Sequence, residues 1–184
     1  MYKVFLQTLR VYLVTNLVLV GVPGAGKSTV GKMLAEELGR EFFDSDVEIE
    51  NRLGKSVSDI FTQDGEATFR ETEAQIIAEL LAGDNRVVSL GGGSLLNEAT
   101  RSSVKNHTVI WLLVNLAGAV SRVGLNRNRP LLLGNVRGQL ADLMQAREPL
   151  YVEVASHKVD TSEMSASDVV TAIIGLVNEQ QDEA

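Results

Sequence analysis

Several residue types are absent or scarce in this chain of 184 residues. It contains no cysteine and three prolines, and aromatic residues make up 5% of it. The absence of cysteine excludes disulfides, thiolate zinc sites, iron–sulfur clusters and a cysteine nucleophile. A chain of this size buries roughly 70% of the surface that it would expose when unfolded, so its core needs no cross-link or structural metal. We therefore expect a single domain over residues 1–184.

Positive charge is also in short supply, and no apolar run is long enough to cross a membrane. The chain carries 17 Lys and Arg against 24 Asp and Glu, a formal net charge of −7, which disfavours nucleic acids and anionic membranes as partners. The most apolar stretch, residues 11–22, is interrupted by Thr15 and Asn16 and reaches about half of the ~20 residues that a membrane span requires. We expect a cytoplasmic monomer that binds neither nucleic acid nor membrane. Residues 1–15 form an N-terminal extension that could be an edge strand, a helix or a start-site extension.

The chain does contain an alternation of short β-branched runs with longer helical patterns. This alternation predicts βαβ units and a mostly parallel sheet. Runs such as residues 17–20 and 109–113 are apolar without alternation, which is typical of strands that helices cover on both faces. We predict a three-layer α/β fold with five parallel strands. The predicted strands are 17–22, 41–44, 87–90, 108–114 and 158–160, and the predicted helices include 28–38, a stretch ending at 81, one from 117, 140–153 and 167–178.

A glycine-rich loop follows the first predicted strand. Residues 21–28 read GVPGAGKS and fit the pattern GxxxxGK[ST] between an apolar strand and an amphipathic helix, which is the context that the pattern requires. Its glycines let successive backbone N–H groups surround phosphate oxygens at a helix N-terminus. We expect Lys27 to reach the β- and γ-phosphates and the Ser28 hydroxyl to bind Mg²⁺; a glycine-rich turn that arose by chance is the alternative. The predicted nucleotide-binding residues of the loop are Gly24, Ala25, Gly26, Lys27, Ser28 and Thr29.

Two carboxylates follow the second predicted strand, in the run Asp44-Ser45-Asp46. Open parallel sheets bind their ligands at the carboxyl ends of the strands, so both carboxylates should lie near the phosphate site. Alternation along an extended chain would point Asp44 and Asp46 to the same side. One could then serve the metal and the other an incoming hydroxyl. The alternative is that Asp46 or Ser45 caps a helix that starts at Val47.

A buried strand then ends in three glycines, in the run SLGGGS over residues 89–94. Such a turn suggests that the backbone closely approaches another group; a plain tight turn is the alternative. The strand carries Ser89 and Leu90 where P-loop enzymes usually have an aspartate. Asp44 is therefore the residue that we expect to take the metal role.

Basic residues of the second half gather around one polar, turn-rich insertion at residues 126–135. Arg122, Arg127 and Arg129 lie in or beside it, an arrangement that suits an anion, although a solvated loop would look the same. Arg70 and Arg147 are ambiguous by themselves, because surface arginines are common. His107 and His157 have no spacing for a metal or a catalytic triad.

In combination, these motifs resemble the shikimate kinase family. The resemblance runs from about residue 17 to residue 178 and comprises GVPGAGKS, DSD, FRETE, SLGGG, NRNRPLL and AREPLY, in that order. It implies an α/β P-loop kinase with sheet order 2-3-1-4-5, a substrate-binding region at about 45–82 and a mobile lid at about 124–138. It also implies transfer of the γ-phosphoryl group of ATP to the 3-hydroxyl of shikimate, with Mg²⁺ as cofactor.

The resemblance further assigns roles to individual residues. Asp46 would hold shikimate hydroxyls and orient or deprotonate the 3-hydroxyl, while Asp44 supports the metal together with Ser28. Lys27, Asp46 and Arg129 would be the catalytic residues. Arg70 and Arg147 would bind the shikimate carboxylate, Gly91, Gly92 and Gly93 would approach the substrate through their backbone, and Arg122 and Arg129 would contact the nucleotide. One departure is the loop DTSEMS at 160–165, which lacks the basic residue and proline often found in the adenine loop of the family.

Three other functions compete with this interpretation. A kinase for another small polyol acid, such as gluconate, would differ in whether Arg70 and Arg147 converge on one carboxylate. A nucleotide-binding module without catalysis need not retain Lys27, Ser28 and both aspartates. A GTPase-type switch would carry an Asn-Lys-x-Asp run, and the sequence has none.

Overall fold

The computed structural model describes residues 15–124 and 135–182 and confirms the predicted fold class. Its five strands form one parallel sheet in the order β2-β3-β1-β4-β5. The central strand β1 pairs with β3 on one side and with β4 on the other. Most of the predicted N-terminal extension, the core of the predicted lid, and Arg127 and Arg129 lie outside the described residues.

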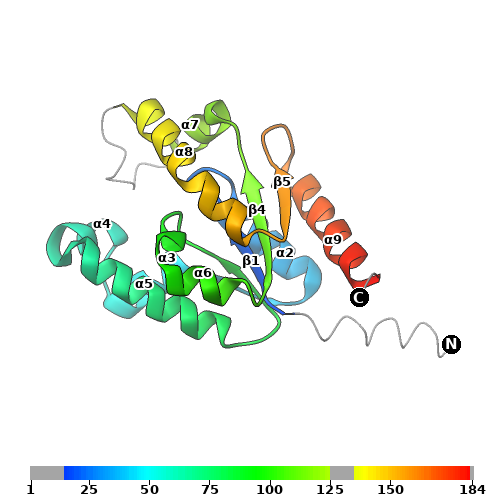
Figure 1. The fold of residues 1–184 in the computed structure, drawn as a ribbon, viewed down its shortest axis with the longest axis horizontal. Coiled ribbons are helices and arrows are strands. Elements are labelled where there is room, and N and C mark those ends of the chain that lie inside the picture. The colour runs from blue at the N-terminus through cyan, green and yellow to red at the C-terminus, as the bar shows by residue number, and fades with distance from the viewer. Residues whose placement is uncertain (1–14, 125–134, 183–184) are drawn as a thin grey trace.

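The elements follow one another in the predicted alternation (Figure 1). The strands are β1 (Leu17–Val20), β2 (Glu41–Asp44), β3 (Arg86–Ser89), β4 (Thr108–Leu113) and β5 (His157–Asp160). The α-helices are α2 (Lys27–Leu38), α3 (Ser45–Leu53), α4 (Val57–Asp59), α5 (Gly65–Leu81), α6 (Glu98–Val104), α7 (Leu116–Gly124), α8 (Val136–Val154) and α9 (Ala166–Asp182). A π-helical turn, η1 (Ile60–Asp64), and a 3₁₀ turn, η2 (Ser94–Leu96), complete the described elements.

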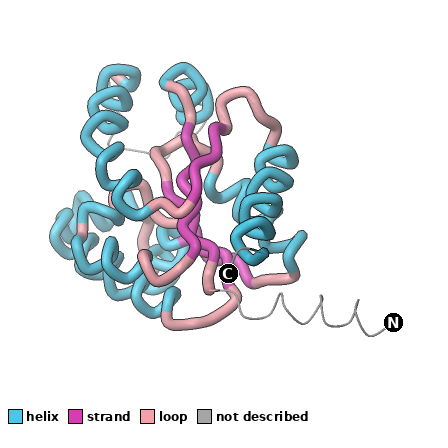
Figure 2. Tube along the Cα trace, turned by 45° about the vertical axis from the view of Figure 1, so that its right-hand side comes forward, coloured by secondary structure: helices cyan, strands magenta, loops and turns pink. Residues whose placement is uncertain are grey.

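The sheet lies between two groups of helices (Figure 2). Helices α2 and α9 pack together on one side of it, and α6 packs against both α5 and α8 on the other side. Residues of β1 and β4 form the centre of the core, where Leu17, Leu19, Ile110 and Leu112 are fully buried. Strands buried on both faces explain why these runs are apolar without alternation.

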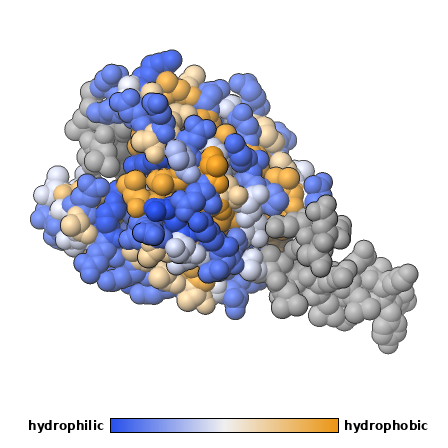
Figure 3. Space-filling view, viewed as in Figure 1, coloured by the Kyte–Doolittle hydropathy of each residue, from blue (hydrophilic) through white to orange (hydrophobic). Residues whose placement is uncertain are grey.

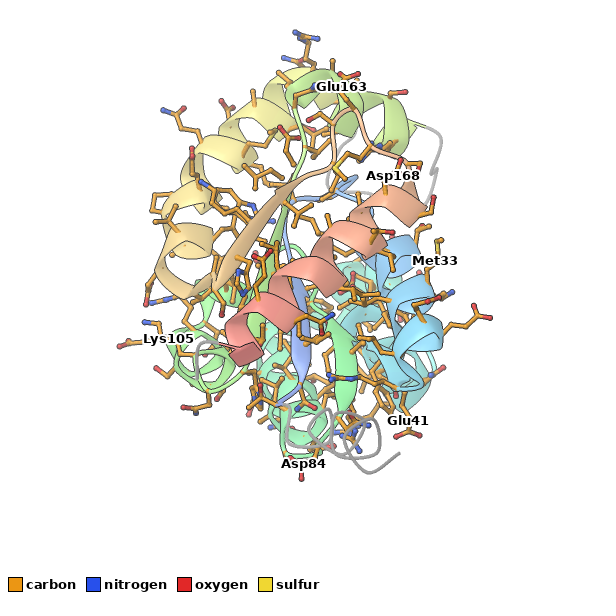
Figure 4. All side chains as sticks on the ribbon, turned by 90° about the vertical axis from the view of Figure 1, so that its right-hand side faces the viewer. Met33, Glu41, Asp84, Lys105, Glu163 and Asp168 are labelled. Carbon is orange, nitrogen blue, oxygen red and sulfur yellow. The ribbon has the colours of Figure 1, made fainter. Side chains whose placement is uncertain are left out.

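All five strands run in the same direction, so their carboxyl ends lie at one end of the molecule. Figure 4 shows Glu163, in the loop after β5, at the opposite end from Asp84, which precedes β3, and Glu41, which begins β2. The loops that follow β1, β2, β3 and β4 therefore share the end marked by Glu163. These loops include the glycine-rich loop, the aspartate run and the three glycines.

The face shown in Figure 3 is mostly polar, with small groups of apolar side chains. Among the described residues, the exposed large hydrophobic side chains are Met33, Val47, Leu96 and Val152. No helix in residues 15–124 or 135–182 is long and apolar enough to cross a membrane.

Candidate active site

The loop between β1 and α2 has the backbone conformation of a phosphate-binding loop. Gly24 and Gly26 have φ values of 85° and 91°, in the left-handed region that favours glycine. A Cβ atom on Gly24 would also lie 2.9 Å from the carbonyl oxygen of Ala119. Gly26 is the N-cap of the 12-residue helix α2, and no side chain caps the helix there. The first N–H groups of α2 are therefore available to an anion.

Lys27 and Ser28 begin helix α2 and lie at this loop. The Lys27 ammonium donates hydrogen bonds to the carbonyl oxygens of Gly21, at 2.8 Å, and Val22, at 3.2 Å. The Ser28 hydroxyl donates to Oδ2 of Asp44 at 2.6 Å. Strand β3 separates β1 from β2 in the sheet, yet this bond joins the start of α2, the helix after β1, to the end of β2. The sequence prediction that Ser28 and Asp44 lie together is confirmed.

The two aspartates occupy different structural positions, and the argument from strand alternation is wrong. Asp44 is the last residue of β2 and the N-cap of α3, where its Oδ1 accepts from the Asp46 N–H at 3.1 Å. Helix α3 begins at Ser45 and not at Val47, so Asp46 belongs to a helical turn. The N-cap is therefore Asp44, and the side chain of Asp46 is not used to cap the helix. The physical reason is that the Asp44 carboxylate, two residues before Asp46, satisfies an N–H group of the first helical turn.

The three glycines after β3 form a turn that two buried serines hold in place. Gly91 donates its N–H to the Ser45 hydroxyl at 2.9 Å and accepts from the Ser94 hydroxyl at 2.8 Å. A Cβ atom on Gly91 would lie 2.5 Å from Oδ1 of Asp46 and 2.8 Å from Oε1 of Glu73. The predicted close approach is confirmed, because both carboxylates lie directly against this backbone.

Arg70 and Arg147 come from different helices and meet at the same turn. Arg147 of α8 donates from Nη1 to the carbonyl oxygen of Gly92 at 2.6 Å. A Cβ atom on Gly93 would lie 2.6 Å from Nη2 of Arg70, which belongs to α5. Neither arginine is a freely solvated surface residue. The prediction that they converge is supported by their common position on adjacent glycines.

Glu73 anchors Arg70 from the next turn of α5. Its Oε2 accepts from Nη1 of Arg70 at 2.7 Å, and only 3% of the Glu73 side chain is exposed. The Arg70 guanidinium also lies 5.1 Å from the ring centre of Phe69. Burial raises the pKa of Glu73, and the charge of Arg70 opposes that rise. Within the described part of the chain, Oε1 of Glu73 has no hydrogen-bond partner, and it faces the Gly91 turn.

Arg122 lies beside the phosphate-binding loop, as a predicted nucleotide contact should. It donates to the Thr161 carbonyl oxygen at 2.8 Å, to the Thr161 hydroxyl at 3.1 Å and to the Gly24 carbonyl oxygen at 3.4 Å. The Thr161 hydroxyl in turn donates to the Leu113 carbonyl oxygen at 2.8 Å. Arg122 thus joins the glycine-rich loop to the segment after β5.

Comparison with known proteins identifies the family. The family model described as shikimate kinase matches residues 23–178. The chain belongs to the shikimate kinase family. Members of this family are ATP-dependent kinases, so the chain is an enzyme of that class.

Individual relatives agree with the family match. The shikimate kinase of Thermobifida fusca is 51% identical over 156 residues, which cover 85% of this chain and 91% of the relative. The solved shikimate kinase from Acinetobacter baumannii in complex with shikimate has a TM-score of 0.89 and 38% identity, and the match covers 92% of this chain and 96% of that one. A gluconokinase from Sinorhizobium meliloti has a TM-score of 0.59 at 20% identity, covering 92% and 94%, which shows a shared fold alone.

Sequence reasoning missed several residues that build this shikimate kinase site. Ser45 and Ser94 hold the Gly91 peptide, Glu73 holds Arg70, Tyr151 contacts Gly92, and Thr161 contacts Arg122. Glu73 lies on the helix of Arg70, within the run FRETE. Its position three residues later is the one usable signal, because residues at i and i+3 share a helix face. The serines and Thr161 gave no signal, since small polar residues are common in turns.

The donor set beside the phosphate-binding loop fits Mg²⁺. The Ser28 hydroxyl and the Asp44 carboxylate meet at 2.6 Å, and both are oxygen ligands. The described residues contain no group of three or more His, Cys, Asp or Glu side chains that could hold a metal. Mg²⁺ commonly binds through one or two protein oxygens plus substrate phosphates and water, and does not require an all-protein cage.

Proposed function

We propose that this enzyme transfers the γ-phosphoryl group of ATP to the 3-hydroxyl of shikimate, giving ADP and shikimate 3-phosphate. The observation that carries the proposal is the convergence of Arg70 and Arg147 on the glycine turn that also contacts Asp46. Two guanidinium groups suit a carboxylate, and a carboxylate suits sugar-like hydroxyls. The site therefore offers complementary groups for both ends of a hydroxylated ring acid.

The acceptor and nucleotide sites adjoin each other. A Cβ atom on Gly92 would lie 3.2 Å from Cδ of Pro23 and 3.3 Å from Nη1 of Arg147. Pro23 belongs to the phosphate-binding loop, so the turn that carries the acceptor contacts touches the loop that carries the phosphate contacts. An acceptor held at Gly92 and a phosphate held at residues 24–29 would be neighbours, as direct transfer requires.

On the nucleotide side, the N–H groups of residues 24–29 and the Lys27 ammonium would bind the β- and γ-phosphates. Ser28 and Asp44 would hold Mg²⁺, with Asp44 acting directly or through water. The metal ion neutralises charge that develops on the phosphate oxygens. Arg122 would contribute to nucleotide binding from its place beside Gly24. Arg129, the remaining predicted catalytic residue, lies outside the described residues.

On the acceptor side, Asp46 would accept a hydrogen bond from the 3-hydroxyl and orient its oxygen toward the γ-phosphorus. The transition state of phosphoryl transfer is loose, so a base contributes less than position and charge. Asp46 would take the hydroxyl proton as the new oxygen–phosphorus bond forms. Arg70 and Arg147 would fix the carboxylate at the other end of the ring and so limit rotation of the substrate.

The test is a coupled ADP-release assay of the full chain with ATP, Mg²⁺ and either shikimate, gluconate or no acceptor. We expect release that depends on shikimate, and ³¹P NMR of the product should show a phosphate monoester on the 3-oxygen. If ADP were released with gluconate but not with shikimate, the acceptor would be another polyol acid in place of shikimate. If ADP release did not require an acceptor, kinase activity toward shikimate and toward gluconate would both be contradicted. The cytoplasmic location and the monomeric state stay predictions from the sequence.

A further inference from the structure

Tyr151 is a buried residue of α8 that the proposed mechanism does not use. Its exposed fraction is 2%. The ring stacks on Trp111 of β4 with ring centres 5.5 Å apart and an angle of 30° between the planes. Lys158 places its ammonium 4.5 Å from the centre of the Trp111 ring. The ring of Tyr151 is therefore buried against β4.

The hydroxyl lies at the acceptor site and shares a partner with Arg147. It donates to the carbonyl oxygen of Gly92 at 3.3 Å, and Arg147 Nη1 donates to the same oxygen at 2.6 Å. Burial raises the pKa of Tyr151 to about 12, although the charge of Arg147 and a hydrogen bond to it act in the opposite direction. The phenol therefore stays protonated at neutral pH and remains a donor.

Arg147 and Tyr151 are four residues apart, so they lie one above the other on the same face of α8. Pro149 lies between them inside the helix. Proline has no N–H, so this turn of α8 lacks one backbone hydrogen bond. Side-chain contacts at this turn consequently have a larger share in fixing Arg147 against Gly92. Each carbonyl oxygen has two lone pairs, and Gly92 uses its oxygen for these two residues.

We propose that Tyr151 is a positioning residue for the acceptor carboxylate: its hydroxyl holds the Gly92 carbonyl and the Arg147 guanidinium in one arrangement. The remaining N–H groups of Arg147 then stay directed to the carboxylate of the acceptor, alongside those of Arg70. This inference rests on the proposed function, because it needs an acceptor carboxylate at Arg147. Tyr151 itself does not touch the reacting atoms.

The primary test is Tyr151→Phe, which removes the hydroxyl and keeps the ring that stacks on Trp111. We expect the KM for shikimate to rise about 5- to 20-fold, since one hydrogen bond in a network with a charged group is lost. The KM for ATP should change less than about twofold and kcat less than about threefold, because the phosphate groups have other partners. An unchanged KM for shikimate, or equal rises for both substrates, would overturn the proposal.

A double-mutant cycle tests whether Tyr151 acts through Arg147. Arg147→Lys alone should raise the KM for shikimate about 10- to 100-fold, because a bidentate contact becomes a point contact. In the Arg147→Lys background, Tyr151→Phe should add less than about twofold, since neighbouring residues that act together are not additive. Full additivity would show that Tyr151 does not position Arg147, and would contradict the proposal.

Trp111→Phe is the matched control for packing. It shrinks the stacking partner of Tyr151 and leaves the hydroxyl in place. We expect a lower melting temperature with a KM for shikimate within about twofold of wild type. If Trp111→Phe raised this KM as much as Tyr151→Phe does, packing and not the hydroxyl would be the cause, and the proposal would fail.

Two further measurements keep the outcomes distinct. The rise in melting temperature that shikimate produces reports binding without turnover, so it applies even to a Tyr151→Phe protein of low stability; a rise equal to that of wild type would refute the positioning role. A wild-type protein without shikimate-dependent ADP release would refute the proposed function itself. An active wild type with an unaffected Tyr151→Phe variant would refute only the present inference.

Discussion

Replacing Gly91 by alanine would place one methyl group between the turn and the two carboxylates of the acceptor site. The Cβ atom would lie 2.5 Å from Oδ1 of Asp46, about 0.9 Å short of an ordinary contact of 3.4 Å. Gly91 is not among the glycines with positive φ in the described residues, so the backbone itself tolerates alanine. The perturbation is therefore a displacement of Asp46 and Glu73.

The size of the effect follows from that displacement. A shift of about 1 Å in a group that orients a reacting atom can reduce the rate by about 10²-fold. Overpacking a buried site costs about 1–3 kcal/mol, which corresponds to a fall of roughly 2–12 °C in melting temperature for a domain near this size. We expect Gly91→Ala to lower kcat by about 10²-fold, with a smaller change in the KM for ATP.

The assay is ADP release with shikimate and ATP varied in turn, with Gly175→Ala as the matched control. Gly175 lies inside α9, and a Cβ atom there would have nothing within 4 Å. Its replacement should stabilise the helix by about 0.5–1 kcal/mol without affecting turnover. Wild-type kcat and KM values in Gly91→Ala would refute the placement of Asp46 in the acceptor site.

Three further predictions concern the charged residues. Lys27→Ala should lower kcat by at least about 10²-fold while shikimate binding, measured by calorimetry, changes little, since the ammonium meets charge on the transferred group; near-normal turnover would exclude the phosphate role. Asp46→Asn should lower kcat by about 10²–10³-fold, whereas Asp44→Asn should raise the Mg²⁺ concentration for half-maximal activity about 10- to 100-fold; reversed phenotypes in the two titrations would exchange the assigned roles. For Glu73, whose pKa burial raises above its ordinary value of 4.5, the native state binds the proton more tightly than the unfolded state does. The unfolding free energy of wild type relative to Glu73→Gln should therefore decline as pH rises from about 4.5 through the raised pKa, and denaturant titrations in which this difference is independent of pH would count against the shift.

The sheet and the phosphate-binding loop could be predicted because their signals are local. Apolar strands, glycines that need positive φ and a lysine at the start of a helix all lie within residues 17–38. The sheet order and the residue roles came from the resemblance to a family, not from periodicity. The predicted and observed ends of elements differ by a few residues where an N-cap residue fixes the start of a helix, as Asp44 does for α3.

The supporting residues of the acceptor site could not be predicted, because their partners are distant in the chain. Gly91 bonds with Ser45, 46 residues away, and Tyr151 reaches Gly92, 59 residues away. Such contacts depend on how α3, α5 and α8 are placed around the turn after β3. The single serines carry no periodic or motif signal for these contacts. Glu73 and Tyr151 lie within the runs FRETE and AREPLY, but those runs do not indicate that the two residues meet the turn after β3.

The acceptor site has a balanced set of charges with a consequence for how substrate arrives. The cations Arg70 and Arg147 lie against the carboxyl groups of Asp46 and Glu73 around one turn, within a chain whose formal net charge is −7. Because these opposite charges lie close together, their electric fields largely cancel at a distance. Physiological salt screens the remaining field beyond ~8 Å. Shikimate, an anion, would then meet no attractive field on approach and would be recognised only on contact, so its encounter rate should depend weakly on ionic strength.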